Sequence, residues 1–405
     1  MKQTIYPILE KMKIILTIFV FFKLALAFEI TNHTFYGTAS LIDEVKDDIK
    51  ISFQRFVEKY DKRYESEDEY EKKFSIYFQN FLEVEKHNVQ NTKWKKAMNK
   101  FSDLSGEEFE EKYGTGYHNL YRPASKSSNL KSILNNVPKG RDWRKHKMIT
   151  AVKDQGSCGS CWAHAATEQL ESYLRLETRN ELVNISVQQI TSCTPNALQC
   201  GGSGGCFGGV PQFGFEYARL VGVVADDEYP YISGETKLTE ACHYNTSTEK
   251  AVVFTRGEET LPHNDYDVII NHLAHKGPLA IAVAVTKAWQ HYEGGVFDGC
   301  SYDENMALNH AVQLVGYGED DIHGDFWIVR NSWGTGWGED GYIRLAREKS
   351  LKCGVNKTPL SGTGCKDDGV KAQKVCGMCG ILFEATYPIG TDVTNHEEPT
   401  IELVL

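Results

Sequence analysis

The chain has 405 residues, more than one hydrophobic core usually supports, so we expect two or three folding units. Hydrophobic residues make up 41% of the sequence, charged residues 24% and aromatic residues 11%, which is a globular composition. The formal net charge of −11 and the absence of a basic run in the sequence argue against a nucleic-acid-binding protein.

The first feature in chain order is an apolar run near the N-terminus. Residues 14–22 are apolar and follow two lysines, and residues 25–27 read Ala-Leu-Ala, the small-x-small form that signal peptidase cuts. The run is too short to span a bilayer, and no later run is long enough. We therefore predict that residues 1–27 are a signal peptide, with Met1 or Met12 as the start, in preference to a buried N-terminal helix.

A secreted chain can carry glycans and keep disulfides. The sequence contains eleven cysteines, so at least one thiol is left over after pairing. Asn-x-Ser/Thr triplets provide four candidate glycosylation sites, at Asn32, Asn184, Asn245 and Asn356.

Residues 40–115 contain no cysteine and are rich in Glu, Lys and aromatic residues. Steps of three and four residues indicate one face of a helix, formed by Glu69, Lys73, Tyr77, Asn80, Val84 and Asn88. Phe74, Phe78 and Phe81 widen this face, so we expect a helical hairpin with a small core of its own. The polar segment 122–136 that follows is predicted to be an exposed, cleavable link.

All eleven cysteines lie beyond residue 136. A helix is predicted from Cys161, because apolar residues then recur every four positions, and strands are predicted at 279–285, 311–317, 326–329 and 342–346. Helices followed by strands indicate an α+β protein with two segregated lobes. Segments 195–205 and 349–374 are Gly-rich and polar, and are predicted to be inserted surface loops.

The stretch DQGSCGSCWA at residues 154–163 offers a nucleophile. Cys161 lies where a loop meets the predicted helix, so the positive end of the helix dipole would favour its thiolate. His310, at the start of an apolar strand, is the candidate base and proton shuttle.

Three further residues complete the candidate site. Asn331 follows a strand and could accept the imidazole N–H, and Trp333 could shield that bond from water. The side-chain amide of Gln155 and the Cys161 backbone N–H could together bind a tetrahedral oxyanion.

Other readings of the two cysteines are weaker. A thioredoxin-like pair of Cys158 and Cys161 would need a βαβ context, which the surrounding sequence lacks. A zinc site would need a nearby second pair, and Cys376 and Cys379 lie more than two hundred residues away. No metal or other cofactor is expected. His164 could perturb the Cys161 thiolate or merely pack.

Three sequence blocks together carry a specific resemblance: DQGSCGSCWA, NHAVQLVGYG and WIVRNSWGTGWGEDGYIRL. They resemble the signature blocks of the papain-like cysteine peptidases, the cathepsin family, over about residues 42–390. The helical stripe from Glu69 to Asn88 resembles the propeptide motif of cathepsin L-like zymogens, and Ala97, Asn99, Phe101 and Asp103 resemble the second propeptide motif.

The resemblance implies a two-lobed papain-like fold, with a helical lobe, an antiparallel β-barrel-like lobe and an N-terminal helical inhibitory prodomain. The implied propeptide is residues 28–136 and the peptidase domain is residues 137–405. Within the peptidase domain, the resemblance implies a mainly helical part, a mainly β part and a short tail, at residues 137–245, 246–390 and 391–405.

The resemblance also implies disulfides Cys158–Cys206, Cys193–Cys242 and Cys300–Cys379, with Cys161 as the free thiol. Cys200, Cys353, Cys365 and Cys376 then allow three pairings, which stay open, although a local bridge in the second insertion is expected.

By the same resemblance, Gly208 and Gly209 would bind the backbone of an extended peptide. The pocket for the P2 side chain would be lined by Val210, Pro211, Ala282, Leu308, Ala311 and Glu384. The first five suit an apolar side chain. The Glu384 carboxylate could pair with a P2 arginine, or could turn out to solvent.

The function implied is that of a secreted or lysosomal cysteine endopeptidase, monomeric, made as a self-inhibited zymogen and acting on proteins and peptides. Its own propeptide is the implied intramolecular inhibitor, and acid would release it by weakening carboxylate contacts such as those of Glu69 and Asp103. Cystatin-type inhibitors are possible further partners, whereas nucleic acid and membrane are not expected for the mature form. An exopeptidase of the same family and a catalytically silent peptide-binding relative are the alternatives.

Overall fold

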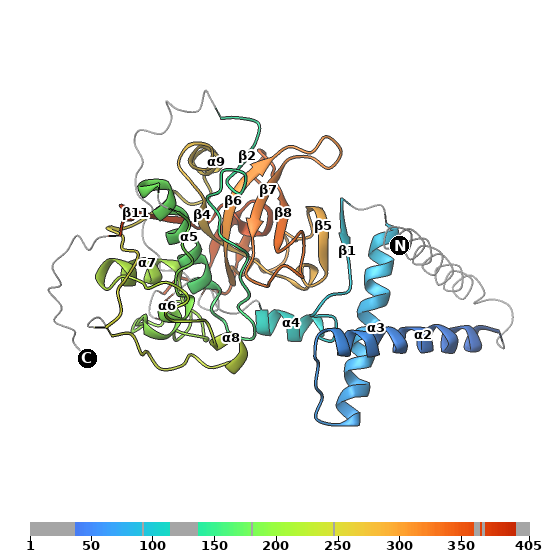
Figure 1. Cartoon of the computed structure of the whole chain (residues 1–405). Coiled ribbons are helices and arrows are strands. Elements are labelled where there is room, and N and C mark those ends of the chain that lie inside the picture. The colour runs from blue at the N-terminus through green and yellow to red at the C-terminus, as the bar shows by residue number, and fades with distance from the viewer. Residues whose placement is uncertain are drawn as a thin grey trace, which may run out of the picture. The chain divides into compact units, whose positions relative to one another are not determined.

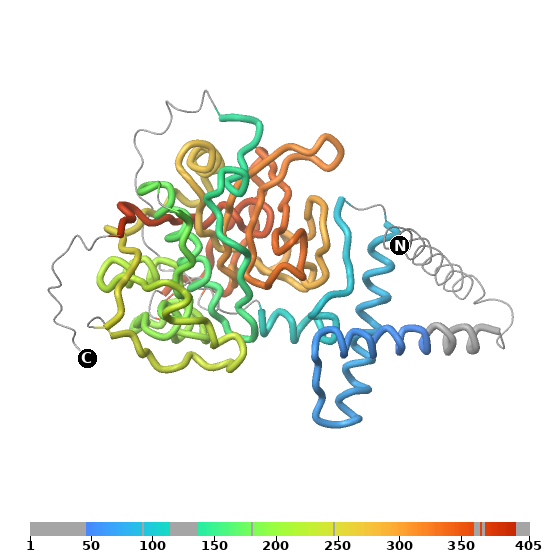
Figure 2. The backbone as a smooth tube through the Cα atoms, viewed as in Figure 1, coloured from blue at the N-terminus to red at the C-terminus, as the bar shows by residue number. Residues whose placement is uncertain are grey.

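The computed structural model of the chain is shown in Figures 1 and 2. It describes residues 37–90, 93–113, 137–179, 181–245, 248–359, 365–366 and 369–393. The predicted signal peptide, the sequon at Asn32, the predicted link and most of the predicted tail lie outside these residues. Within them, no helix is both long and apolar enough to cross a membrane. The chain divides into two compact units, residues 1–83 and 84–405.

The first unit contains the predicted helical hairpin. Helix α2 spans Gly37–Lys59, and α3 spans Glu67–Val89 and runs on into the second unit. The two helices share an aromatic core, in which the Phe53 ring lies 5.1 Å from that of Tyr77 and 5.5 Å from that of Phe74. At the start of α3 the Ser66 hydroxyl accepts a hydrogen bond from the Glu69 N–H at 3.2 Å, which caps the helix.

The second unit is built on a nine-stranded sheet in the order β1-β5-β8-β7-β6-β4-β11-β3, with β2 added beside β6. Neighbouring strands are antiparallel except β5 and β8, which are parallel. The strands are β1 Trp94–Lys96, β2 Arg141–Asp142, β3 Gly257–Thr260, β4 Leu279–Val283, β5 Tyr292–Phe297, β6 His310–Gly318, β7 Phe326–Arg330, β8 Tyr342–Ala346 and β11 Ala385–Ile389.

The α-helices within the described part of this unit are α4 Gly106–Tyr113, α5 Cys161–Thr178, α6 Val187–Cys193, α7 Pro211–Leu220, α8 Ser233–Thr236 and α9 Tyr266–His275. All of them except α9 precede β3 in the sequence. Helix α5 lies between α6 and α7 on one side and the sheet on the other, and it packs on α6, α7, β4 and β6 (Figure 1). This position explains why its first fourteen residues are all buried. The helix ends at Thr178, and its C-cap residue Arg179 adopts a left-handed conformation with φ of 60°.

The two-lobed α+β architecture predicted from the sequence is confirmed. Helix α5 begins at Cys161 as expected, and β4, β6, β7 and β8 match the four predicted strands. β4 is two residues shorter than predicted, because the Ala284 and Val285 N–H groups leave the strand ladder for Cys379 O and Asn309 Oδ1. The lobes are less segregated along the chain than expected, since β2 joins the sheet and α9 lies among the strands.

The prediction that residues 349–374 form only a surface loop is wrong. Two strands, β9 Cys353–Asn356 and β10 Gln373–Cys376, pair antiparallel there and make a second small sheet. Asn356 lies in this pair, fully buried, and its amide donates a hydrogen bond to Gln373 Oε1 at 3.2 Å. A glycan on Asn356 is therefore incompatible with the folded chain, whereas Asn184 and Asn245 are exposed.

Every cysteine lies within the described residues. The structure contains the disulfides Cys158–Cys206, Cys193–Cys242 and Cys300–Cys379. It pairs the other four as Cys353–Cys376, which is local, and Cys200–Cys365, which joins the two inserted segments. Cys161 is left as a free, buried thiol.

Candidate active site

Cys161 is the first residue of α5, where backbone N–H groups are not used by the helix itself. Its Sγ accepts a weak hydrogen bond from the Ala311 N–H at 3.5 Å, which brings the helix start against strand β6. Burial raises the pKa of the thiol to about 12, although the N–H groups of Ala311, Trp162 and Cys161 itself act in the opposite direction. With this pKa the thiol is neutral at pH 7.

His310 opens β6 and is completely buried. Its Nε2 donates to Asn331 Oδ1 at 2.8 Å, and the same oxygen accepts the Ser332 N–H, so it acts as an acceptor to both. The His310 Nδ1 atom therefore carries no proton in the neutral ring, and it has no hydrogen-bond partner among the described residues. Burial lowers the pKa of the ring to about 4, opposed by the Asn331 contact.

The indole of Trp333 covers this pair. Its ring lies 5.0 Å from the His310 ring in a stacked arrangement and is itself fully buried. Water is thus kept from the His310–Asn331 hydrogen bond, which strengthens that bond.

Gln155 lies in the loop before α5, and two contacts fix its side-chain amide. Its Oε1 accepts from the Ser332 hydroxyl at 2.7 Å, and its Nε2 donates to Cys158 O at 3.0 Å. The second hydrogen of Nε2 is not used by these contacts. The Cys158–Cys206 disulfide holds the same loop, so the amide is positioned by both covalent and hydrogen bonds.

His164 packs in the protein interior, one turn after Cys161. Its Nδ1 donates to Ser160 O at 3.0 Å, and its ring meets the Tyr231 ring edge-on at 4.9 Å. Burial lowers the pKa of His164 to about 3, so the ring is neutral. The Tyr231 hydroxyl contacts Ser160 Oγ at 2.6 Å and Gln155 O at 2.9 Å. Sequence reasoning missed Tyr231, whose hydroxyl contacts both Gln155 and Ser160 in the loop before α5.

The two glycines predicted to bind substrate backbone have physical reasons to be glycine. Gly208 adopts a positive φ of 93°. A Cβ on Gly209 would lie 2.7 Å from the indole of Trp162. Val210 and Pro211, at the start of α7, are buried, as are Ala282, Leu308 and Ala311. The last three belong to the same apolar cluster as Cys161, and Ala282 and Ala311 are register partners in β4 and β6.

Glu384 is buried, so the structure contradicts the alternative in which its carboxylate turns out to solvent. Its side chain is only 1% exposed, and its Oε1 accepts a hydrogen bond from Gln212 Nε2 at 2.7 Å. His263 lies on the other side, with Nδ1 3.8 Å from Glu384 Oε2. Gln212 and His263 are far from Glu384 in sequence, and nothing in the local pattern pointed to either.

Residues 94–113, which precede the peptidase part, also contact this site. Strand β1 adds to the edge of β5, and Asn99 donates to Gln290 O at 2.8 Å. Lys100 pairs with Asp154 at 2.5 Å, next to Gln155. Three buried rings from this stretch lie 5.4–6.0 Å from the ring of Trp333, namely Phe101, Phe109 and Tyr113.

The disulfides contradict two alternatives for these cysteines, a redox pair of Cys158 and Cys161 and a zinc site that includes Cys376 and Cys379. Cys158 is bonded to Cys206 instead of Cys161, and Cys376 and Cys379 are both in disulfides. Across the described ranges, His, Cys, Asp and Glu side chains form no cluster of three that could hold a metal ion.

A thiol at a helix start, faced from a second lobe by a His–Asn pair and flanked by an amide, defines the class of thiol peptidases. Residues 137–363 match the papain family cysteine protease domain, and residues 53–109 match the cathepsin propeptide inhibitor domain. The chain belongs to the papain family. It is a cysteine peptidase that carries an inhibitory propeptide.

Similar proteins agree with this assignment. The chain is 37% identical over 311 residues to a cathepsin L-like protein of Caenorhabditis elegans. The aligned region covers 74% of this chain and 87% of that protein. It is 33% identical to vignain of Vigna mungo, with 80% and 81% covered. Among solved structures, a recombinant stem bromelain precursor has a TM-score of 0.68 at 29% identity, with 84% and 99% covered. Digestive procathepsin L 3 of Tenebrio molitor larval midgut has a TM-score of 0.67, also at 29% identity, with 84% of this chain and 99% of that chain covered.

Proposed function

We propose that the chain is the zymogen of an endopeptidase that hydrolyses peptide bonds through a thioester on Cys161, with His310 as acid and base. The observation that carries this proposal is the orientation of His310. Its Nε2–H is held by Asn331 Oδ1 at 2.8 Å, which leaves the Nδ1 lone pair available to take a proton.

The reaction follows from these groups. His310 Nδ1 takes the Cys161 proton as Sγ attacks the substrate carbonyl carbon, and then gives that proton to the leaving amine as the C–N bond breaks. Water next gives a proton to Nδ1 and attacks the thioester carbonyl carbon. The C–S bond then breaks, the carboxylic acid leaves, and the proton on Nδ1 returns to the Cys161 sulfur. Asn331 keeps the ring in one tautomer throughout, as a neutral acceptor that adds no charge.

The tetrahedral intermediates place negative charge on the former carbonyl oxygen. The N–H of Cys161, which the helix itself does not use, and the second hydrogen of Gln155 Nε2 are the donors we assign to this oxygen. The Cys158 carbonyl fixes which end of the Gln155 amide is the nitrogen, because a carbonyl oxygen can only accept, and the Ser332 hydroxyl then donates to Oε1.

Latency in this proposal has two sources. The propeptide residues Phe101, Phe109 and Tyr113 cover Trp333, and burial keeps Cys161 and His310 neutral. Cleavage in the segment 122–136 and loss of residues 28–136 would expose the site to solvent, which favours the thiolate–imidazolium form.

For substrate choice we propose an apolar P2 side chain, with arginine also accepted through Glu384. Ala282, Leu308 and Ala311 supply apolar surface. Glu384 is desolvated and held by Gln212, so a P2 guanidinium would meet a fixed carboxylate.

We further propose that residues 1–27 direct the chain into the secretory pathway, that the enzyme acts in lysosomes or outside the cell as a monomer, and that Asn184 and Asn245 carry glycans. Exposed sequons and five disulfides are compatible with that route.

The experiment uses the acid-activated protein and a peptide epoxide that alkylates active-site thiols. We expect one label per chain on Cys161 and matching loss of peptidase activity, with neither label nor activity in Cys161→Ala. A labelled protein that cleaves no peptide would identify a silent peptide-binding relative.

Peptide substrates blocked at both ends test the mode of cleavage. Internal cleavage of blocked peptides supports an endopeptidase, and cleavage that requires a free terminus would show an exopeptidase. Matched substrates with Arg or Leu at P2, cut by wild type and by Glu384→Gln, test the pocket. We expect the Gln variant to lose Arg cleavage selectively, and no Arg cleavage by the wild type would contradict the assignment.

A further inference from the structure

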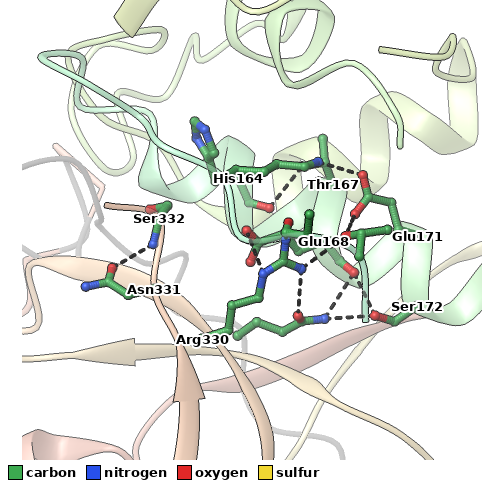
Figure 3. Close-up of polar contacts among 12 residues, drawn as sticks. His164, Thr167, Glu168, Glu171, Ser172, Arg330, Asn331 and Ser332 are labelled. Atoms are coloured by element: carbon green, nitrogen blue, oxygen red, sulfur yellow. Dashed lines mark hydrogen bonds and ion pairs between the residues drawn. The ribbon is translucent and has the colours of Figure 1, made fainter. Parts of the chain in front are cut away.

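A buried ion pair lies between the two lobes, two helical turns along α5 from Cys161 (Figure 3). Glu168 on α5 is 1% exposed, and Arg330 at the end of β7 is completely buried. The Arg330 Nε lies 3.5 Å from Glu168 Oε1. Glu168 and Cys161 are seven residues apart, so they lie on the same face of the helix.

The guanidinium of Arg330 also donates hydrogen bonds to three groups other than Glu168. It donates to Thr150 Oγ1 at 3.2 Å, to Gln313 Oε1 at 3.4 Å, and to the carbonyl of Ala151. The Glu168 Oε1 atom, in contrast, makes no hydrogen bond in the described part of the chain. The Glu168 contact with Arg330 is thus mainly a charge interaction and depends on ionisation of the carboxyl group.

Three elements that carry the proposed catalytic residues meet at this contact. Gln313 lies on β6, three residues after His310, and is the register partner of Arg330 on β7. Its Nε2 donates to Glu168 O at 3.0 Å. Asn331 directly follows Arg330, and consecutive strand residues point to opposite faces. Arg330 therefore reaches α5 from one face while Asn331 holds His310 on the other.

We propose that Glu168 is a positioning residue for the catalytic site: its ion pair with Arg330 holds the end of β7, and with it Asn331 and His310, in register with the helix that carries Cys161. This inference rests on the proposed roles of those three residues. It adds a contact, remote from the substrate, on which the relative positions of Cys161, His310 and Asn331 depend.

Ionisation of Glu168 makes the idea testable through pH. Burial raises the pKa of the Glu168 carboxyl to about 7, with Arg330 and Lys153 acting in the opposite direction. The carboxyl is therefore neutral in acid, and the ion pair is complete only above about pH 7. The charged or titratable groups around it are Arg330 on β7, Lys153 in the loop before α5, Glu171 and His164 on α5, and Tyr342 on β8.

Two of these neighbours balance each other. Lys153 Nζ contacts Glu171 Oε1 at 2.6 Å, and Thr150 donates to Glu171 Oε2. The pair Lys153–Glu171 carries no net charge, so an ionised Glu168 is what neutralises Arg330. A neutral Glu168 leaves the Arg330 guanidinium held only by its hydrogen bonds to Thr150, Gln313 and Ala151, so the end of β7 loses its charge contact with α5.

The test compares activated wild type with Glu168→Gln, which keeps the shape and removes the charge. Glu177→Gln is the matched control, because Glu177 is exposed on the same helix. Active sites are counted by epoxide titration, so that misfolded protein does not enter the rate. We expect the kcat of Glu168→Gln at pH 8 to fall roughly tenfold with KM within twofold, as a misplaced catalytic group requires.

The pH profile separates positioning from a general structural role. The wild-type to Glu168→Gln ratio of kcat should approach one at pH 5 and rise with a midpoint near pH 7, and Glu177→Gln should follow wild type throughout. Glu168→Asp, which keeps a charge on a shorter side chain, provides a second variant if the Gln form folds poorly, and it should lose part of the pH 8 activity.

Two results overturn the inference: a kcat ratio independent of pH, or Glu168→Gln indistinguishable from Glu177→Gln. Either result in an enzyme whose wild type is active and labelled at Cys161 refutes only the role of Glu168. An unlabelled, inactive wild type would instead refute the proposed function.

Discussion

Truncation of Phe109 to alanine should weaken the latency of the zymogen. Phe109 lies on α4 with no exposed surface, and its ring meets the Trp333 ring edge-on at 5.4 Å. It also lies 5.4 Å from Phe101 and 5.6 Å from Tyr113, so its removal opens a cavity at the centre of the cluster that covers Trp333.

The size of the effect follows from the burial. Replacing a fully buried Phe by Ala typically costs about 3–5 kcal/mol, and an aromatic edge-to-face contact contributes about 0.5–1.5 kcal/mol of such a loss. Part of the cavity cost stays within the propeptide, because Phe109 also packs on Phe101 and Tyr113. We take about 3 kcal/mol for docking against Trp333, which corresponds to roughly a hundredfold shift towards the undocked propeptide.

The assay follows the uncleaved zymogen at neutral pH. A fluorogenic peptide reports activity before processing, and a gel reports the half-time of processing after a shift to acid. We expect Phe109→Ala to raise the early activity and shorten the half-time, Phe109→Leu to give a smaller effect, and Lys112→Ala on the exposed side of the same helix to leave both unchanged. A folded Phe109→Ala zymogen as latent as wild type would refute the reasoning.

Three other predictions concern ionisation and geometry. In the zymogen, the raised pKa of Cys161 leaves about one thiolate in 10⁵ at pH 7, so alkylation by iodoacetamide, followed by mass spectrometry, should keep accelerating up to at least pH 9; a plateau below that pH would contradict the burial argument. Asn331→Ala should lower the kcat of the activated enzyme by about 10²-fold with little change in KM, because His310 loses its fixed tautomer; an unchanged kcat in steady-state assays would exclude that role. Burial raises the pKa of Glu168 from 4.5 to about 7 in the folded chain, so the protonated carboxyl favours folding by about 3 kcal/mol below about pH 4.5, and this contribution is lost as pH rises through 7. Melting temperatures of the zymogen between pH 5 and 8 should therefore fall less in Glu168→Gln than in wild type, and equal slopes would show that Glu168 is not the cause.

Local sequence patterns predicted the elements that are regular over many residues. The four-residue recurrence after Cys161 placed the start of α5, and the apolar runs placed β4, β6, β7 and β8 to within two residues, because one periodicity dominates each. The roles assigned to Cys161, His310, Asn331 and Gln155 came from chemical requirements and from the resemblance of the sequence blocks. The structure brings these residues into one site.

What the sequence did not reveal depends on contacts between distant segments. Glu168 and Arg330 lie 162 positions apart, and neither has a neighbour that would mark it as half of a buried pair. Gln212 and Glu384 are likewise joined only by the fold. Strands β9 and β10 were missed because each is four residues long in a polar segment, where pairing and a disulfide, rather than periodicity, stabilise them.

The Cys200–Cys365 disulfide has a consequence for the integrity of the polypeptide. Among the five disulfides, it alone connects a cysteine before residue 243 with one after residue 299. A single proteolytic cut between these positions would otherwise leave two separate chains, one with the Cys161 thiol and the other with His310 and Asn331. With this bond in place, the nicked protein remains one covalent molecule with a complete site, and the cut becomes visible on a denaturing gel only after reduction.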